Sequence, residues 1–262
     1  MIMPVMQKYD NLTGLIRSYE RVGVAFSGGI DSSLLLHAAG EVLGKRNVIA
    51  LHGRSLLNRG ITDIEKLFSR NFQTVARLKL IDLDPLSWSD FVNNDSARCY
   101  YCKKKTYTLF REHLVQEDIS VLLDGTNVDD RQEHRPGHAV LEELQVHAPL
   151  EQVGIGKKEI RFLAKSFGLT HYNLPSNSCL ATRLGYLPKI DDSDLNRVKR
   201  IEGQLEVMGF QGCRARPSEL GVFLEVRQQD FLKISSVHNR KMITNLCRSE
   251  GFVDVFLNLS GR

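Results

Sequence analysis

Positions 27–32 combine the residue types that hold phosphate groups. They read Ser-Gly-Gly-Ile-Asp-Ser, and the glycines allow a tight turn that exposes backbone N–H groups, to which the serines add hydroxyl donors. A buried-strand pattern at 21–26 precedes them and a helical pattern at 32–43 follows, so the positive end of a helix would face the ligand. The segment lacks the lysine of the kinase and GTPase loop. We therefore expect a nucleotide site of a different kind, formed by Ser27, Gly28, Gly29, Asp31 and Ser32. The alternative is a capped glycine turn without a ligand, which uses the same residue types.

A second polar segment, at 124–130, follows another predicted strand. It reads Asp-Gly-Thr-Asn-Val-Asp-Asp and offers a hydroxyl, an amide and carboxylates. Carboxylates beside a triphosphate favour a Mg²⁺ site, whereas a polar turn that only ends a strand is the alternative. Arg135 comes shortly after and has the guanidinium that pairs with phosphate or carboxylate. The nucleotide ligands predicted from this region are Gly125, Thr126, Asn127, Asp129 and Arg135.

Cys99 and Cys102 form a Cys-x-x-Cys motif among four cations, Arg98 and the lysines at 103–105. Neighbouring cations favour the thiolate, which is both a metal ligand and a nucleophile. The motif is shared by redox pairs, zinc sites and iron–sulfur sites. A helix expected to start at Lys104 leaves Cys99 in a loop, which weakens the redox interpretation. The sequence has no second Cys-x-x-Cys that would complete a zinc site.

Cys179 is a third candidate, because it lies in a polar segment between Pro175 and Arg183. Three cysteines can hold three irons of a [4Fe–4S] cluster and leave the fourth iron open to another ligand. Cys213 starts a predicted strand, and Cys247 lies on the apolar face of a predicted helix. We expect these two thiols to be structural.

Strand and helix patterns alternate through the first half of the chain, which predicts an α/β fold with a parallel, doubly wound sheet covered on both faces. Ligands of such sheets bind beyond the carboxyl ends of the strands, where both polar segments would lie. A different order follows residue 185 and predicts a small α+β module. We expect a nucleotide-binding domain at 1–182 and a substrate-binding and oligomerisation domain at 183–262. The expected strands are 21–26, 48–52, 78–83, 120–124, 212–216, 222–226 and 253–259, and the expected helices are 11–19, 32–43, 62–76, 104–114, 157–167, 191–208 and 234–247.

The composition limits the class of protein. Hydrophobic residues make up 42% and charged residues 25% of the 262 residues, which are ordinary values for a globular chain. The apolar runs are too short to cross a bilayer and the N-terminus has no secretory pattern, so we expect a cytoplasmic protein without membrane attachment. The net charge of +4 suits a small anionic substrate and does not by itself argue for nucleic acid.

The loop at 27–32 resembles the pyrophosphate loop of the ATP pyrophosphatase superfamily, whose members cleave ATP between the α and β phosphates and adenylate a substrate oxygen. The chain as a whole resembles the LarE family, ATP-dependent sulfur transferases that make the nickel-pincer cofactor of lactate racemase. This likeness extends from about residue 21 through the C-terminal module. It is carried by the segments 27–32, 98–104, 124–130, 135–137, 149–150, 158–161 and 175–183.

The resemblance implies that the substrate is a small nucleotide, pyridinium-3,5-biscarboxylic acid mononucleotide. Each carboxylate would be adenylated with Mg–ATP, with Asp31 positioning Mg²⁺ and pyrophosphate, and sulfur would then displace AMP to give a thiocarboxylate. One kind of relative sacrifices the cysteine that matches Cys179. Another kind holds a [4Fe–4S] cluster with an extra sulfide on positions that match Cys99, Cys102 and Cys179. All three cysteines are present, which favours the kind with a cluster. Sulfide or another sulfur donor would then recharge the cluster. The sacrificial route stays open.

The resemblance also assigns residues of the C-terminal module. Arg214 and Arg216 lie two apart on one strand, hence on one face, and match a clamp for the substrate phosphate. Arg183 is a further substrate-binding match. The acidic positions that match ligands of an additional cation are Glu202, Glu225 and Asp230. Family members form trimers or hexamers, which implies a homo-oligomer.

Three other functions would use part of this pattern. A tRNA thiolase also joins a pyrophosphate loop to a cysteine-held [4Fe–4S] cluster, but the basic face and extra cysteine pairs expected of that class are not apparent in the sequence. An ammonia-using synthetase shares the loop and has no need of three cysteines. A regulator that only binds a nucleotide or a cluster has no need of carboxylates at a triphosphate.

Overall fold

The computed structural model describes residues 2–58, 64–132, 136–173, 179–185 and 187–261. The chain forms two compact units. We call residues 1–55, 60–83 and 99–177 the larger unit, and residues 56–59, 84–98 and 178–262 the smaller unit. The predicted domains, 1–182 and 183–262, stay a prediction; residues 84–98 and 178–182 pack with the smaller unit.

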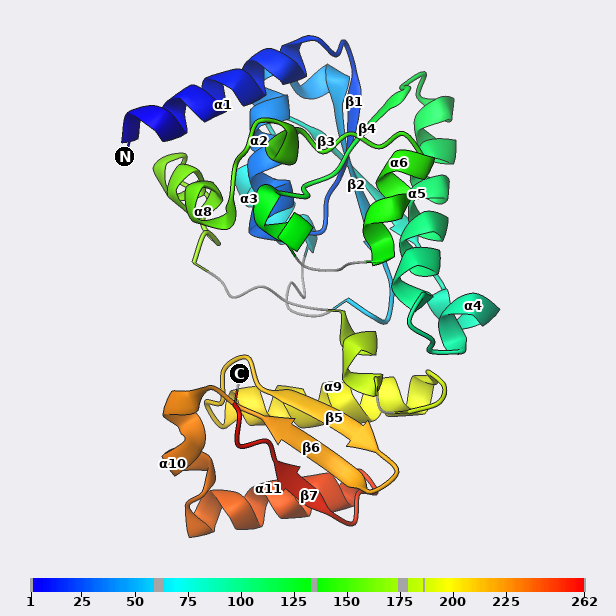
Figure 1. Cartoon of the computed structure of the whole chain (residues 1–262), viewed down its shortest axis with the longest axis vertical. Helices are drawn as coiled ribbons and strands as arrows, with labels where there is room; N and C mark the ends of the chain where they lie inside the picture. The colour runs from blue at the N-terminus through cyan, green and yellow to red at the C-terminus, as the bar shows by residue number, and fades with distance from the viewer. Residues whose placement is uncertain (1, 59–63, 133–135, 174–178, 186, 262) are drawn as a thin grey trace. The chain divides into compact units, whose positions relative to one another are not determined.

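The larger unit contains a four-stranded sheet in the order β3-β2-β1-β4, and all neighbouring strands are parallel (Figure 1). Helices cover the sheet, which confirms the predicted α/β fold. The helices and strands of this unit are α1 (Ile2–Arg17), β1 (Val22–Ala25), α2 (Ile30–Leu43), β2 (Val48–Arg54), α3 (Ile64–Asn71), β3 (Arg77–Asp82), α5 (Arg98–Gln116), β4 (Val121–Leu123), α6 (Ala139–Glu143), α7 (Pro149–Gln152) and α8 (Lys157–Ser166).

Successive side chains of the sheet enter two separate apolar cores. Val24 of β1 packs in a core with residues of α1, α2, α3 and α8, whereas the next residue, Ala25, packs with residues of α5 and α6. Gly23 allows α5 to approach β1 closely, because a Cβ at this position would lie 2.6 Å from Cδ1 of Leu114. Both faces of β1 are therefore buried, which fixes the strand end from which the predicted phosphate loop emerges.

The smaller unit contains a three-stranded sheet in the order β5-β6-β7, in which β5 and β6 are antiparallel and β6 and β7 parallel. Residues of α9 and α11 pack on one face of this sheet in a third apolar core. The elements are α4 (Ser89–Val92), the 3₁₀ helix η5 (Leu180–Leu184), α9 (Asp192–Val207), β5 (Arg214–Ser218), β6 (Gly221–Glu225), α10 (Phe231–Ile234), α11 (Val237–Ser249) and β7 (Val255–Leu257).

Several helix predictions are wrong at their boundaries. The helix predicted at 11–19 covers Ile2–Arg17, and the helix predicted at 62–76 ends at Asn71. The helix predicted to begin at Lys104 begins at Arg98 and includes both cysteines of the Cys-x-x-Cys motif. The helix predicted at 234–247 is divided into α10 and α11, because Ser236 caps the second helix by accepting the Asn239 N–H at 3.3 Å. The short helices α4, α6 and α7 have too few turns to produce a helical pattern in the sequence.

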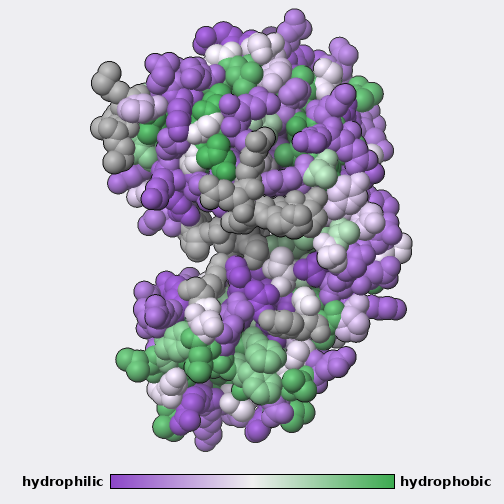
Figure 2. All heavy atoms as spheres, in the orientation of Figure 1, coloured by the Kyte–Doolittle hydropathy of each residue, from purple (hydrophilic) through white to green (hydrophobic). Residues whose placement is uncertain are grey.

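Hydrophobic residues gather on the smaller unit on the face that Figure 2 shows. Exposed apolar side chains of this unit include Val207, Leu220, Leu232, Val237, Val253 and Leu259. The homo-oligomer stays a prediction. None of the described helices has the length and apolar character needed to cross a membrane.

Candidate functional site

The predicted phosphate loop connects β1 to α2 in the larger unit. Gly28 has a φ of 79°, a left-handed conformation that favours glycine, and Gly29 is the N-cap residue of α2. The hydroxyl oxygens of Ser27 and Ser32 lie 3.1 Å apart, and Ser32 donates to the Gly29 carbonyl at 3.0 Å. Asp31 lies in the first turn of α2. The structure brings all five predicted loop residues to one helix N-terminus, an arrangement that favours bound phosphate.

The second polar segment packs directly against this helix end. A Cβ at Gly125 would lie 2.9 Å from the backbone nitrogen of Ser32 and 3.2 Å from the carbonyl carbon of Asp31. Only a glycine allows this approach without a shift of one backbone or the other. The two segments that the sequence predicts separately therefore form one rim at the carboxyl ends of β1 and β4.

Asp124 connects this rim to α5. Its buried carboxylate accepts hydrogen bonds from the Thr126 N–H at 2.7 Å and from the hydroxyls of Thr126 and Tyr107. Lys103 places its Nζ 3.4 Å from Asp124 Oδ2. Burial by itself would raise the pKa of Asp124, but Lys103 and the hydrogen bonds outweigh burial and lower it. Burial, and next the charge of Asp124, raise the pKa of Tyr107, so the phenol remains a donor.

Lys103 and Tyr107 are candidates that sequence reasoning missed. Lys103 was visible only as one of the cations around the cysteines, and no sequence pattern connects it to Asp124. The helical spacing of four residues between Lys103 and Tyr107 is the one available signal, and it indicates no more than a shared helix face. In the structure the ammonium of Lys103 also lies 5.1 Å from the centre of the Tyr107 ring.

The two carboxylates that end the second polar segment, of which Asp129 is a predicted nucleotide ligand, have structural partners. Asp129 Oδ2 accepts the Lys157 N–H at 2.5 Å at the start of α8, and Asp130 pairs with Lys157 Nζ at 3.1 Å. Asn127 is fully buried, and its Nδ2 has no hydrogen-bond partner among the described residues. The two carboxylates thus hold α8, whereas the Asn127 amide fits a polar ligand. Arg135 lies outside the described residues.

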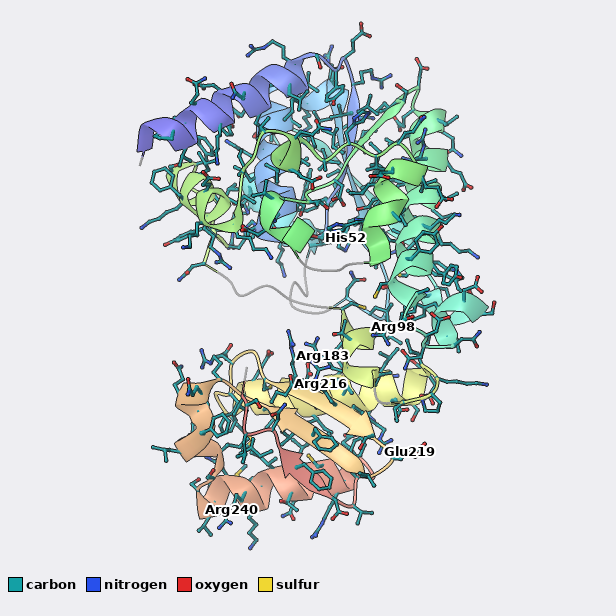
Figure 3. All side chains as sticks on the ribbon, viewed as in Figure 1. His52, Arg98, Arg183, Arg216, Glu219 and Arg240 are labelled. Atoms are coloured by element: carbon teal, nitrogen blue, oxygen red, sulfur yellow. The ribbon has the colours of Figure 1, made fainter. Side chains whose placement is uncertain are left out.

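His52 is another residue that the sequence patterns did not single out (Figure 3). It is buried near the carboxyl end of β2, and its Nδ1 lies 2.8 Å from the carbonyl oxygen of Phe26, which precedes Ser27. Burial lowers the pKa of His52. The hydrogen bond to the Phe26 carbonyl acts in the opposite direction, and the charge of Arg54 lowers the pKa further. A neutral His52 that donates from Nδ1 supports the start of the predicted phosphate loop.

The structure brings two of the three candidate cysteines together. Cys99 and Cys102 lie in the first turns of α5, and a spacing of three residues puts both thiols on neighbouring positions of the helix surface. Cys99 is exposed and Cys102 is partly buried. Cys179 is exposed in the smaller unit, directly before η5. Its grouping with the other two stays a prediction.

The remaining cysteines are buried, in agreement with their predicted structural role. Cys213 and Cys247 both belong to the apolar core of the smaller unit. Burial, followed by the charge of Glu250, raises the pKa of Cys247 to about 11. This thiol is therefore protonated and unreactive at neutral pH.

The predicted substrate-binding arginines lie in the smaller unit and pair with two glutamates; Figure 3 labels Arg183 and Arg216. We call these residues the arginine cluster: Arg183, Arg214, Arg216, Glu202 and Glu225. Arg183 is 1% exposed and donates from Nε to Glu202 Oε1 at 3.0 Å. Glu202 is fully buried and also accepts the Ala215 N–H of β5 at 2.8 Å. This ion pair fixes η5 against α9 and β5.

Arg214 and Arg216 share Glu225 across the β5–β6 pair. Arg216 donates from Nε to Glu225 Oε1 at 2.6 Å, and Arg214 Nη1 lies 4.0 Å from Glu225 Oε2. Their common partner confirms that both guanidiniums lie on one face of β5. Arg216 Nη1 also donates to the carbonyl of Thr182 at 2.5 Å. Thr182 directly precedes Arg183 in the sequence.

The acidic residues predicted to hold an additional cation each pair with an arginine. Glu202 pairs with Arg183, Glu225 pairs with Arg216, and Asp230 accepts from Arg227 Nε at 3.0 Å. No group of three or more His, Cys, Asp or Glu side chains within the described part of the chain is arranged to hold a metal ion. These carboxylates orient guanidiniums in the structure, and their role as metal ligands stays a prediction.

Curated relatives match nearly the whole chain. A pyridinium-3,5-bisthiocarboxylic acid mononucleotide synthase of Lactiplantibacillus plantarum is 31% identical over 97% of this chain and 91% of its own length. The chain belongs to the LarE family. An uncharacterized protein of Synechocystis is 27% identical to this LarE-family chain, over 97% of the chain and 94% of its own length. An uncharacterized protein of Methanocaldococcus jannaschii is 30% identical, over 92% of the chain and 90% of its own length. No protein-family model matches the chain.

Proposed function

We propose that this LarE-family protein adenylates the carboxylates of pyridinium-3,5-biscarboxylic acid mononucleotide with Mg–ATP and replaces each adenylate with sulfur. The relative's name supplies the bisthiocarboxylic acid mononucleotide as the product class. One observation carries the ATP-dependent step: Gly125 packs on the backbone of Ser32 and so joins two polar segments at the start of α2.

In this proposal the phosphates of ATP bind at the rim in the larger unit. Backbone N–H groups at the start of α2 and the hydroxyls of Ser27 and Ser32 receive the β and γ phosphates. A substrate carboxylate attacks the α phosphorus, the bond to the bridging oxygen of the β phosphate breaks, and pyrophosphate leaves with that electron pair. Lys103, 3.4 Å from Asp124, supplies a positive charge that the loop lacks and that stabilises the leaving pyrophosphate.

Mg²⁺ would accompany ATP, and Asp31 is the carboxylate that the loop itself offers. Carboxylate and phosphate oxygens are the ligands that Mg²⁺ prefers. Asp129 and Asp130 fit this role less well, because their carboxylates contact the backbone and side chain of Lys157. We therefore assign Mg²⁺ to Asp31 and the phosphates.

The sulfur would come through the cysteines by one of two routes. Cys99, Cys102 and Cys179 would hold a [4Fe–4S] cluster, and two of these thiols on the surface of α5 fit such a group. The cluster would supply an extra sulfide as the nucleophile. In the alternative route, Cys179 Sγ attacks the adenylated carbonyl and expels AMP. The Cβ–S bond then breaks with loss of the Cα proton, which leaves dehydroalanine and a thiocarboxylate.

The substrate's phosphate would bind at the arginine cluster in the smaller unit. Arg214 and Arg216 present guanidiniums from one face of β5, and Glu225 fixes their orientation. Guanidiniums bind phosphate in a bidentate manner, so the pair would hold the nucleotide in one register. Arg183 is buried against Glu202, and it would act by holding η5 and the Cys179 segment in place.

A comparison of substrates tests the proposal. The protein is incubated anaerobically with Mg–ATP and sulfide, together with either the biscarboxylic mononucleotide or tRNA, and AMP and sulfur-containing products are measured. We expect AMP formation that depends on the mononucleotide and yields a thiocarboxylate. AMP formation that depends on tRNA, or on neither substrate, would reject the proposed substrate.

Iron content and mass separate the two sulfur routes. On the cluster route, the anaerobically reconstituted protein is brown and holds about four irons, and Cys99→Ala loses both the colour and thiocarboxylate formation. On the sacrificial route the protein is colourless, and turnover lowers the mass of the chain by about 34 Da, the loss of H₂S from Cys179.

A further inference from the structure

We propose that Arg98 is a specificity-determining residue that binds an oxyanion of the substrate together with the arginine cluster. The inference rests on the proposed function and adds a residue to its substrate site. Arg98 is the first residue of α5 but packs with the smaller unit. It therefore lies in the same unit as Arg183, Arg214 and Arg216.

Asn94 fixes the position of Arg98 relative to the cluster. Its Oδ1 accepts a hydrogen bond from Arg98 Nη1, while its Nδ2 donates to the carbonyls of Leu184 at 2.7 Å and Leu187 at 2.5 Å. Asn94 has a φ of 55°, a left-handed conformation that asparagine tolerates better than most residues. Leu184 follows Arg183 in η5, so one asparagine side chain connects Arg98 to the segment that carries the cluster.

The bonding of Arg98 differs from that of the cluster arginines. Arg183 and Arg216 each contact a carboxylate at 3.0 Å or less, whereas no ion pair among the described residues involves Arg98, whose side chain bonds to the neutral amide of Asn94. A guanidinium has five N–H donors in a planar fork, and one amide oxygen engages a single nitrogen. The remaining donors have the geometry for a bidentate bond to carboxylate or phosphate.

The burial of Arg98 strengthens such a bond. The side chain is partly buried, and a charge pair in partly buried surroundings is screened less by water than one on the open surface. Figure 3 shows Arg98, Arg183 and Arg216 on the elements that carry them: α5, η5 and β5. The proposed substrate carries two carboxylates and one phosphate. A phosphate clamp at Arg214 and Arg216 leaves carboxylates for another cation to recognise.

The test measures binding by calorimetry with the full-length protein. The probes are the biscarboxylic mononucleotide, the pyridinium-3-carboxylic acid mononucleotide, and the biscarboxylic nucleoside without phosphate. Arg98→Gln should weaken binding of the first probe about 10- to 100-fold, the effect of losing a hydrogen bond to a charged group. Arg98→Lys keeps the charge without the fork and should lie in between. Neither variant should change ATP binding. Arg240→Gln, which alters an exposed arginine of α11 (Figure 3), is the matched control.

The probes also identify the oxyanion. If Arg98 binds a carboxylate, the penalty of Arg98→Gln persists for the nucleoside and shrinks for the monocarboxylic mononucleotide; if it binds phosphate, the reverse holds. If Arg98→Gln binds the substrate as well as wild type does, or loses affinity equally for ATP and substrate, the proposed role of Arg98 is wrong. Neither result bears on the proposed function. A wild-type protein that binds none of the probes rejects the proposed function as well. If Arg98→Gln does not fold, Arg98→Lys decides, since the role of Arg98 requires it to bind the substrate more weakly than wild type.

Discussion

The two polar regions that we propose as anion sites differ in their construction. The rim of the larger unit uses backbone N–H groups and hydroxyls, and its shape depends on the contact between Gly125 and Ser32. The arginine cluster of the smaller unit uses guanidiniums held by buried carboxylates. The rim should therefore be sensitive to changes of backbone shape, and the cluster should be sensitive to changes of charge.

The buried ion pair of the cluster gives the largest expected effect. Arg183→Met leaves Glu202 as an uncompensated charge in a fully buried position, so the free energy of unfolding should fall by about 3–5 kcal/mol. Denaturation by urea, followed by circular dichroism, measures this change. Replacing both partners, as in Arg183→Met with Glu202→Leu, should restore part of the loss. A single variant as stable as the matched Arg240→Met control would show that the pair contributes little.

The glycine contact of the rim should control the ATP step. Gly125→Ala inserts a methyl group 2.9 Å from the Ser32 nitrogen, so the phosphate site shifts and mononucleotide-dependent AMP formation should fall about 100-fold. Binding of the mononucleotide itself should not change. Gly14→Ala is a matched control, because no atom lies within 4 Å of a Cβ at this exposed position of α1. A Gly125→Ala variant with full activity would separate the two polar segments functionally.

Charge at the cluster should control substrate binding and leave ATP use intact. Arg216→Gln removes the guanidinium that Glu225 orients, and we expect the KM for the mononucleotide to rise about tenfold or more. The KM for ATP should stay the same. Glu219→Gln changes an exposed charge in the turn after β5 (Figure 3) and should leave both constants unchanged. If Arg216→Gln raised both KM values equally, this would contradict the proposal that ATP binds to the larger unit and the mononucleotide to the smaller unit.

The smallest effect concerns acid stability. The pKa of Asp124 is lowered in the folded protein, because Lys103 and hydrogen bonds outweigh burial. Asp124 therefore contributes stability above its ordinary pKa, about 3.9, and this contribution disappears as the pH falls through the lowered value. In Lys103→Met the folded pKa rises, so the variant should lose stability at a higher pH than wild type. Thermal unfolding between about pH 3 and 7 measures this, and coincident profiles would argue against the Lys103–Asp124 contact.

The sequence predicted the parts of the fold that depend on repeated local patterns. The parallel sheet, and the turn between β1 and α2, followed from apolar runs that alternate with helical patterns and from glycines between them. The start of α5 was missed because the segment around Cys99 and Cys102 is polar and cationic, without the apolar spacing that indicates a helix. The split between α10 and α11 depends on a single cap at Ser236.

The contacts that connect distant parts of the chain could not be predicted in this way. Asp124 and Lys103 are 21 positions apart, and Arg183 and Glu202 are 19 apart; no local pattern encodes such pairs. The same limit applies to Asp129, whose role as a nucleotide ligand stays a prediction. Its hydrogen bond to Lys157 becomes visible only when α8 is folded beside the strand end.

The most direct test of the account separates adenylation from sulfur transfer in one protein. A variant with Cys99, Cys102 and Cys179 all replaced by alanine retains the phosphate loop, Gly125 and the arginine cluster. With Mg–ATP, sulfide and the biscarboxylic mononucleotide, it should still release pyrophosphate and form the acyl adenylate, detected by mass spectrometry. It should form no thiocarboxylate, whereas the wild-type protein forms both products. A folded variant that releases no pyrophosphate, or one that still forms thiocarboxylate, would contradict the account.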